Sequence, residues 1–295
     1  MNLLWISVTV LVVSGCASEK KATPPPLPQP SAANGVTSVE PWLPRYDLKA
    51  KRPRQTKLPG KISEISGLAI TSDGRLLCHD DESAVVYEID PWTGKILAQY
   101  SFGNGFLEDD FEGIAVKEDT VFVVNSSGDI FQFRQAPDRG HASFKLFKTS
   151  LSQKNDIEGL EFDPVTDCLL LACKGDAGKG LGGFKAVYAF SLTTRRLIDS
   201  PRFLIPLKEV NNASKGTFCP SGIAIHPLSG TIFVISADSH AVVELDRHGR
   251  ILAQEEIPRN VNSQPEGIAF MSDGTMILAN DGQGGAGTIT MYPTK

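Results

Sequence analysis

Acidic and amide side chains recur at matching positions of a motif that the chain repeats five times. One position before a recurring glycine lie Ser66, Glu112, Glu158, Ser221 and Glu266. At the end of the second strand expected in each repeat lie Asp80, Asn125, Cys173, Ser236 and Asn280. Carboxylate and amide oxygens that converge from several directions suit Ca²⁺, which takes about six to eight oxygen ligands. We therefore expect a calcium site formed by Glu112, Glu158, Glu266, Asp80, Asn125 and Asn280.

Three further side chains are expected to contact a ligand at the same place. Asp156 lies two positions before Glu158 and so on the same side of the strand. Lys174 could meet an anionic ligand, or it could form a salt bridge with Asp156 or Glu158. His79 is the best acid–base candidate, and its alternative is a hydrogen-bonding surface residue.

The repeated carboxylates also have a structural alternative. Each could accept hydrogen bonds from backbone amides of its own or the next repeat, and repetition favours this alternative because function seldom needs the same residue everywhere. If the carboxylates lie close together rather than bonding to backbone amides, they repel one another unless a cation or a proton offsets the charge.

Signatures of enzymes are scarce. The five histidines show no zinc-ligand spacing and no His-Glu-x-x-His segment. The glycine-rich segment 174–183 lacks the Gly-Lys-Ser/Thr ending of a phosphate-binding loop, and no Gly-x-Ser-x-Gly motif occurs. We assign no catalytic residue, leave open whether the chain is an enzyme, and favour binding over catalysis.

The elements that position these residues are short strands. The recurring glycines return about every 45 residues, with a longer third interval, and such a period filled with short strands indicates a β-propeller with one four-stranded blade per repeat. They are Gly67, Gly113, Gly159, Gly222 and Gly267. Strand starts and the ends of their antiparallel neighbours share one face, which places the polar positions around the mouth of the central channel.

We predict an all-β fold of five blades, with six as the alternative. The fifth repeat lacks a fourth strand, and residues 54–59 could supply it and close the ring, which removes exposed sheet edges. Residues 201–218, in the long third interval, could hide strands of a sixth blade.

The N-terminal segment predicts export. An apolar run from Leu3 to Val13 is too short to span a bilayer and leads to Ser14, Gly15 and Cys16. It resembles a bacterial lipoprotein signal, which implies a signal peptide over 1–15 and a lipid on Cys16, although no Lys or Arg precedes the apolar run. An ordinary export signal is the alternative. Residues 16–45 are Pro-rich and polar and fit a tether, and 46–295 form the propeller.

Compartment and partners follow from the same features. The lipid anchor would hold the protein on a membrane of the bacterial cell envelope, and Ala17 after the cysteine favours the outer membrane. The net charge of −5 argues against nucleic acid as a partner. Export permits disulfides, so Cys173 and Cys219 could pair, with free cysteines as the alternative.

The chain resembles the SdiA-regulated (YjiK/CarP-like) family of bacterial β-propellers. The segments that carry the resemblance include 64–68, 110–115, 169–175, 220–224 and 265–269, and together they cover about residues 46–293. NHL and regucalcin-like propellers share single motifs of this kind. The resemblance implies an exported propeller of a kind sometimes linked with calcium responses. We expect a tethered module that binds calcium, a small ligand or an envelope protein; the alternative is a calcium-dependent hydrolase of phytase or lactonase type.

Overall fold

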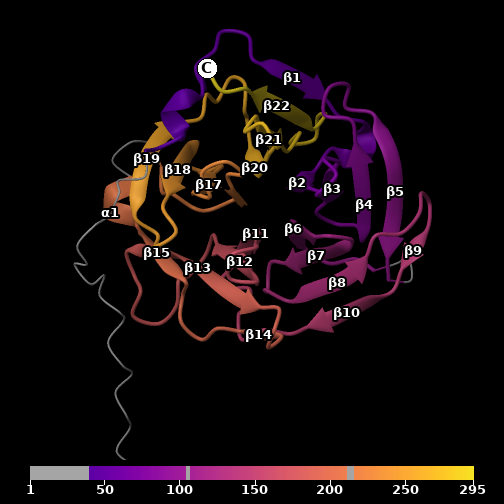
Figure 1. Ribbon diagram of the computed structural model, residues 1–295, viewed down its shortest axis with the longest axis horizontal. Helices are drawn as coiled ribbons and strands as arrows, with labels where there is room; N and C mark the ends of the chain where they lie inside the picture. Colours follow the sequence, from indigo (N-terminus) through magenta and orange to yellow (C-terminus); the bar gives the residue numbers. More distant parts are fainter. Residues whose placement is uncertain (1–39, 104–106, 211–215) are drawn as a thin grey trace, which may run out of the picture. The chain divides into compact units, whose positions relative to one another are not determined.

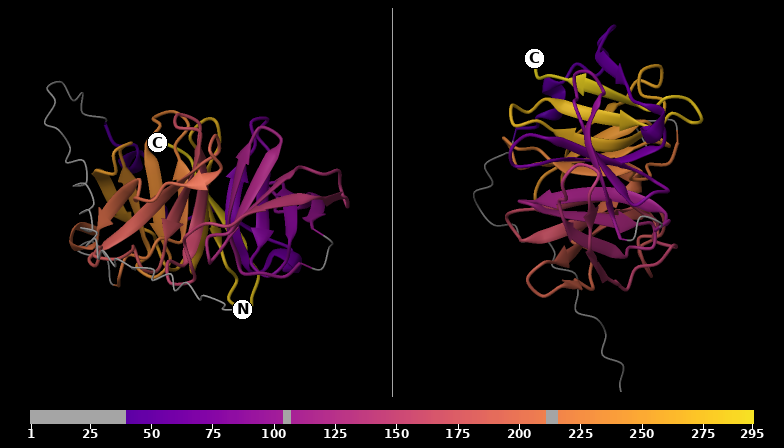
Figure 2. Two further views of the ribbon diagram at one scale, coloured as in Figure 1. Left: turned by 90° about the horizontal axis from the view of Figure 1, so that it is seen from below. Right: turned by 90° about the vertical axis from the view of Figure 1, so that its right-hand side faces the viewer.

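Five small antiparallel sheets stand in a ring around a common axis (Figure 1). The computed structural model describes residues 40–103, 107–210 and 216–295. The prediction of an all-β propeller with five blades is therefore confirmed. Side views show the strands of each blade running roughly along the axis of the ring (Figure 2).

Each blade begins with its innermost strand. Blade 1 comprises β2 (Ile65–Ile70), β3 (Leu76–Asp80), β4 (Val85–Ile89) and β5 (Ile96–Phe102), extended by β9 (His141–Ala142). Blade 2 comprises β6 (Phe111–Lys117), β7 (Thr120–Asn125), β8 (Ile130–Arg134) and β10 (Phe144–Phe147). Blade 3 comprises β11 (Ile157–Asp163), β12 (Cys168–Cys173), β13 (Phe184–Ser191), β14 (Arg196–Leu197) and β15 (Phe203–Pro206). Blade 4 comprises β16 (Gly222–Ile225), β17 (Ile232–Ser236), β18 (Ala241–Leu245) and β19 (Ile251–Glu256).

Blade 5 takes its strands from both ends of the described chain. It comprises β20 (Pro265–Phe270), β21 (Met276–Asn280), β22 (Thr288–Tyr292) and β1 (Arg54–Lys57). Strand β1 pairs with β22 in antiparallel register, with Arg54 opposite Met291 and Lys57 opposite Thr288. The predicted closure of the ring by an N-terminal strand is thereby confirmed.

The long third interval belongs to blade 3. Strand β13 carries two partners on one edge, β14 at its C-terminal end and β15 at its N-terminal end. A single turn of helix, α1 (Leu207–Val210), follows β15. The residues that suggested a sixth blade therefore widen the third blade in the described part of the chain.

The core lies between the blades. Five apolar clusters each join one blade to the next, and the last joins blade 5 back to blade 1. Between blades 1 and 2, the rings of Phe102 and Phe133 stack with centroids 4.4 Å apart. Every blade therefore depends on its two neighbours for burial of its apolar faces.

The packed structure begins several residues before the predicted end of the tether. The 3₁₀ helix η1 (Leu43–Arg45) buries Leu43 completely against blades 4 and 5. Its amide is held by the buried Glu244 carboxylate, which accepts hydrogen bonds from the backbone nitrogens of Trp42 (3.0 Å) and Leu43 (2.7 Å). A second 3₁₀ turn, η2 (Gly60–Ile62), follows β1.

Two sets of sequence predictions concern the N-terminal region and the cysteines. The predicted signal peptide, Cys16 and the tether up to residue 39 lie outside the described residues. Among the residues that are described, no helix combines the length and the apolar character needed to cross a bilayer. Cys78, Cys168, Cys173 and Cys219 are free, so the Cys173–Cys219 disulfide that the sequence allowed is not formed.

Candidate functional site

A β-bulge directs one side chain of each acidic inner strand toward the ring axis. The register shifts between Phe111 and Gly113 in β6, between Ile157 and Gly159 in β11, and between Pro265 and Gly267 in β20. Such a bulge leaves one residue unpaired and re-aims its side chain. The unpaired residues are Glu112, Glu158 and Glu266. The sequence predicted these three carboxylates to meet, and the structure brings them together.

The three glutamates line the start of a narrow axial channel. The channel holds only about 10 Å³ of free space, and the recurring glycines and the aliphatic residues that follow them form its wall. Ser66 donates a hydrogen bond to the Glu112 carbonyl (2.9 Å) and lies 3.1 Å from Glu112 Oε2. Ser221, the corresponding residue of blade 4, donates to the Pro265 carbonyl (2.7 Å). Serines in these blades therefore link neighbouring inner strands.

Burial and mutual repulsion raise the pKa values of these glutamates. Burial, with the carboxylates of Glu158 and Asp110, raises the pKa of Glu112 to about 10. Burial raises the pKa of Glu266 to about 7, although a hydrogen bond from Gln264 Nε2 (2.6 Å) acts in the opposite direction. At neutral pH Glu112 is therefore a neutral hydrogen-bonding group.

One ammonium group lies among these carboxyls. Lys174 Nζ is 2.7 Å from Glu158 Oε1, so the salt bridge considered from the sequence is present. Burial lowers the pKa of Lys174, whereas Glu158, Asp156 and Glu266 raise it. The net effect is a raised pKa. Burial raises the pKa of Glu158 against the effect of Lys174. Lys174 thus occupies the position where a cation would otherwise meet these glutamates.

The Nδ2 groups of the amides predicted as calcium ligands bond to residues of the loops that connect the blades. Asn125 donates from Nδ2 to Asp109 Oδ2 (2.9 Å), and its Oδ1 accepts from the Asp129 amide (2.8 Å). Asn280 is buried and donates to Asn262 Oδ1 (3.2 Å) in the loop between blades 4 and 5, while its own Oδ1 has no hydrogen-bond partner among the described residues. Neither side chain is shared with the glutamates of the channel.

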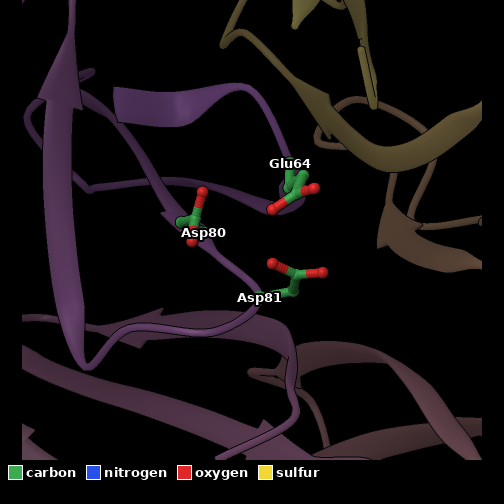
Figure 3. A group of neighbouring side chains, drawn as sticks. All are labelled: Glu64, Asp80 and Asp81. Carbon is green, nitrogen blue, oxygen red and sulfur yellow. The ribbon is translucent and has the colours of Figure 1, made fainter. Parts of the chain in front are cut away.

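The remaining predicted carboxylate belongs to a different cluster. Asp80 meets Glu64 and Asp81, and one carboxyl oxygen from each lies within 4.8 Å of the others. Figure 3 shows the carboxyl groups of Glu64 and Asp81 facing each other, with Asp80 beside them. Backbone hydrogen bonds fix this arrangement, since the Asp81 amide donates to the Glu64 carbonyl (3.3 Å) and the Phe111 amide donates to the Asp81 carbonyl (2.8 Å).

The cluster is short of positive charge. Asp81 Oδ1 is buried and has no hydrogen-bond partner among the described residues. Burial, followed by repulsion from Asp80, Glu64, Glu82 and Asp281, raises the pKa of Asp81 to about 7. Oxygens within 4.8 Å of one another can share a Ca²⁺ ion, since each Ca–O bond is about 2.3–2.6 Å long. The donor set therefore fits a hard cation.

Glu64 and Asp81 were not among the residues predicted to bind calcium. The available signal was the pair Asp80–Asp81 at the end of β3, since two consecutive carboxylates occur there in no other blade. Side-chain counting along the strand selected Asp80 alone because Asp81 lies just beyond the strand end.

His79 is not a surface residue. It is fully buried, its Nδ1 lies 3.1 Å from the Asp80 carbonyl, and its Nε2 packs beside Gly67. Burial lowers its pKa to about 4, so the ring is neutral at ordinary pH. His79 therefore supports the wall between the channel and the carboxylate cluster.

Comparison with known proteins agrees with the fold. Residues 197–289 match the SdiA-regulated family, which confirms the predicted resemblance over that part of the chain. No curated protein matches the chain.

Solved structures with similar coordinates are distant in sequence. The glutaminyl cyclase of Myxococcus xanthus has a TM-score of 0.54 at 12% identity, covering 81% of this chain and 93% of that chain. A luciferin-regenerating enzyme has a TM-score of 0.52 at 13% identity, covering 82% and 95%. The aldose sugar dehydrogenase of Streptomyces coelicolor, in its PQQ-bound form, has a TM-score of 0.50 at 13% identity, covering 83% and 99%. At these identities the similarity concerns the fold alone.

Proposed function

We propose that the chain is a lipid-anchored propeller of the bacterial cell envelope that binds Ca²⁺. The proposed site lies at the end of the ring where Glu64, Asp80 and Asp81 meet near the channel glutamates, which we call the acidic face. The observation that carries the proposal is the Glu64–Asp80–Asp81 cluster, whose oxygens lie within 4.8 Å while Asp81 Oδ1 lacks a partner. The cluster replaces the larger ligand set predicted from the sequence, of which it retains Asp80.

The chemistry of the cluster favours a doubly charged ion with oxygen ligands. Bringing three carboxyls together costs free energy, because each ionised group repels the others, and a cation offsets that cost. Glu82 and Asp281 add negative charge around the cluster, and no ion pair among the described residues includes Glu64, Asp80 or Asp81. A cation that binds would displace the proton from Asp81 and satisfy its buried oxygen.

Binding rather than a reaction is the role that we assign to this face. A small ligand or an envelope protein could complete the coordination of the ion, because three protein carboxylates leave several of its positions to other oxygens. In that arrangement the ion would link the propeller to its partner.

The anchor is proposed from the sequence around Cys16. Expression in a Gram-negative host with a radiolabelled palmitate precursor should label the wild-type protein and leave Cys16→Ser unlabelled. Equal labelling of both forms would reject lipid attachment at Cys16.

Calorimetric titration of the EGTA-treated protein with Ca²⁺ tests the metal site. We expect saturable binding that Asp81→Asn weakens at least about tenfold, because the amide removes one negative charge and keeps the shape of the side chain. Asp119→Asn is the matched control, since Asp119 is exposed in the turn between β6 and β7 and pairs with Arg134 of the same blade.

The variant Glu112→Gln, studied in the same titration, distinguishes binding at the channel glutamates from binding at the Glu64–Asp80–Asp81 cluster. If Glu112→Gln abolishes binding while Asp81→Asn preserves it, the ion lies in the channel and the Glu64–Asp80–Asp81 assignment is wrong. A wild-type protein that shows neither heat of binding nor a change in melting temperature with Ca²⁺ would reject the metal function altogether.

A further inference from the structure

A cavity of about 460 Å³ lies at the other end of the inner strands. The acidic face is formed by residues that precede the recurring glycines and by the ends of the second strands, whereas this cavity is lined by residues that follow the glycines by two to seven positions. Its wall includes Ala69, Val116, Glu161, Ala224 and Ala269, so all five inner strands contribute to it. The narrow channel between the two ends holds about 10 Å³, which separates the cavity from the acidic face.

One side chain of this cavity departs from the repeat. The second position after the glycine is alanine in four blades, at Ala69, Ala115, Ala224 and Ala269, and glutamate in blade 3, at Glu161. The alanines keep the end of the channel wide, and their uniformity suits a purely structural role. A carboxyl in one blade alone is not required by the fold, because the other four blades form without it.

The carboxyl of Glu161 has no cationic partner. No ion pair among the described residues includes Glu161, and no Lys, Arg or His lines the cavity. The other lining carboxylate, Asp73, is already engaged by Arg75 Nε (2.8 Å) and Thr71 Oγ1 (2.5 Å).

The surroundings of Glu161 oppose its ionisation. Burial raises the pKa of Glu161 to about 8, while the backbone amides of Phe162 and Ile225 act in the opposite direction. A positively charged ligand would reverse this effect by stabilising the carboxylate.

We propose that this cavity binds a small organic cation, a protonated amine whose ammonium pairs with Glu161 and whose compact apolar body contacts the alanines and Phe270. Pockets that recognise small molecules combine apolar contact surface with polar groups that fix orientation. This cavity offers both, because apolar residues such as Ala269 and Phe270 lie beside polar residues such as Thr71 and Ser272. The site is independent of the calcium site, since it shares no residue with the Glu64–Asp80–Asp81 cluster.

Ligand-detected NMR titration in EGTA tests the proposal with three probes of one shape. Phenethylammonium is the amine, 3-phenylpropanoate carries the opposite charge, and 2-phenylethanol is neutral. We expect saturable binding of the amine, binding at least about tenfold weaker for the alcohol, and no binding of the carboxylate, because only the amine supplies a charge for Glu161.

Glu161→Ala is the decisive variant because it gives blade 3 the residue that the other four blades have at this position. It should fold, as circular dichroism and the melting temperature will show, and bind the amine at least about tenfold more weakly than the wild type. Ala69→Leu should also reduce amine binding by filling the cavity, and Asp119→Asn should leave it unchanged.

Three results would overturn the proposal. They are the absence of saturable amine binding up to about 10 mM, equal binding of the amine and the carboxylate, and undiminished amine binding by folded Glu161→Ala. Because all titrations are made without Ca²⁺, these outcomes are distinct from a failure of the calcium site.

Discussion

Each inner strand carries glycine where it comes closest to the next blade. A Cβ at Gly113 would lie 2.7 Å from the backbone nitrogen of Leu160, and a Cβ at Gly67 would lie 3.1 Å from that of Ile114. The same relation connects Gly267 to Leu68 across the closure of the ring, at 3.3 Å. The glycine of the motif is therefore required by the close contact between neighbouring blades.

Gly113→Ala tests this reading of the motif. The added methyl group collides with backbone atoms of blade 3, which cannot rotate away, so we expect the free energy of unfolding to fall by about 1–3 kcal/mol. Urea denaturation followed by circular dichroism measures the loss. Gly60→Ala is the control, because nothing lies within 4 Å of a Cβ at Gly60. Equal stability of both variants would contradict the role assigned to Gly113.

The positions of side chains in the ring were predictable from the sequence, whereas their hydrogen-bond partners were not. Glu112, Glu158 and Glu266 meet as predicted because their position next to the glycine sets their depth in the ring. Asn125 and Asn280 occupy the predicted strand ends, yet their amides bond to Asp109 and Asn262, which lie in loops. A count along strands gives the position of a residue but contains no information on the loop that its side chain meets.

At the scale of elements, β1 holds the ring closed through its ladder with β22. Proline cannot donate to such a ladder. In the double variant Gln55→Pro/Thr56→Pro, one of the two prolines removes a backbone N–H that donates to β22. This follows because every second N–H of an edge strand points toward the neighbouring strand. We expect a loss of about 2–4 kcal/mol in the free energy of unfolding and increased light scattering, since the edge of β22 is uncovered.

The control for β1 is the same substitution pair just outside the strand. Lys51 and Arg52 are exposed and lie before β1, so Lys51→Pro with Arg52→Pro should change stability little. If both pairs have the same melting temperature, β1 contributes nothing to closure.

The closing strand was predictable because blade 5 lacked a fourth strand and residues 54–59 preceded the first repeat without another assignment. The place of the insertion in blade 3 was not predictable from the sequence. A short strand such as β15 has the same composition whether it widens an existing sheet or begins another. Only its pairing with β13 distinguishes these cases.

At the scale of the whole molecule, the buried carboxyls make stability depend on pH. The folded protein holds protons on Glu266 and Asp81 up to a pKa of about 7, on Glu161 to about 8 and on Glu112 to about 10, all above the ordinary values of 4.5 and 3.8. Between the ordinary and the raised pKa the folded state binds more protons than the unfolded chain, so stability falls as pH rises.

The clearest window is pH 6.5 to 9. Below pH 6.5, His79 and His226 make stability rise with pH, which opposes the effect of the carboxyls. Both rings have pKa values lowered to about 4 and must be neutral in the folded state. Within this window, we expect Ca²⁺-free protein to lose stability by on the order of 1 kcal/mol per pH unit from Glu112. Differential scanning calorimetry should show a smaller decline for Glu112→Gln. A flat profile in the wild type would contradict the buried, protonated state of Glu112.

The clasp between β1 and β22 ties the last residues of the chain to nearly the first that are packed. Gln55 donates a hydrogen bond to Thr290 although the two residues are 235 positions apart, so the ring closes only when the segment that carries β22 is in place. A product truncated before β22 leaves β1 without a partner and an open β21 edge for proteases. Through this pairing the fold makes closure of the ring depend on two segments that lie far apart in the sequence.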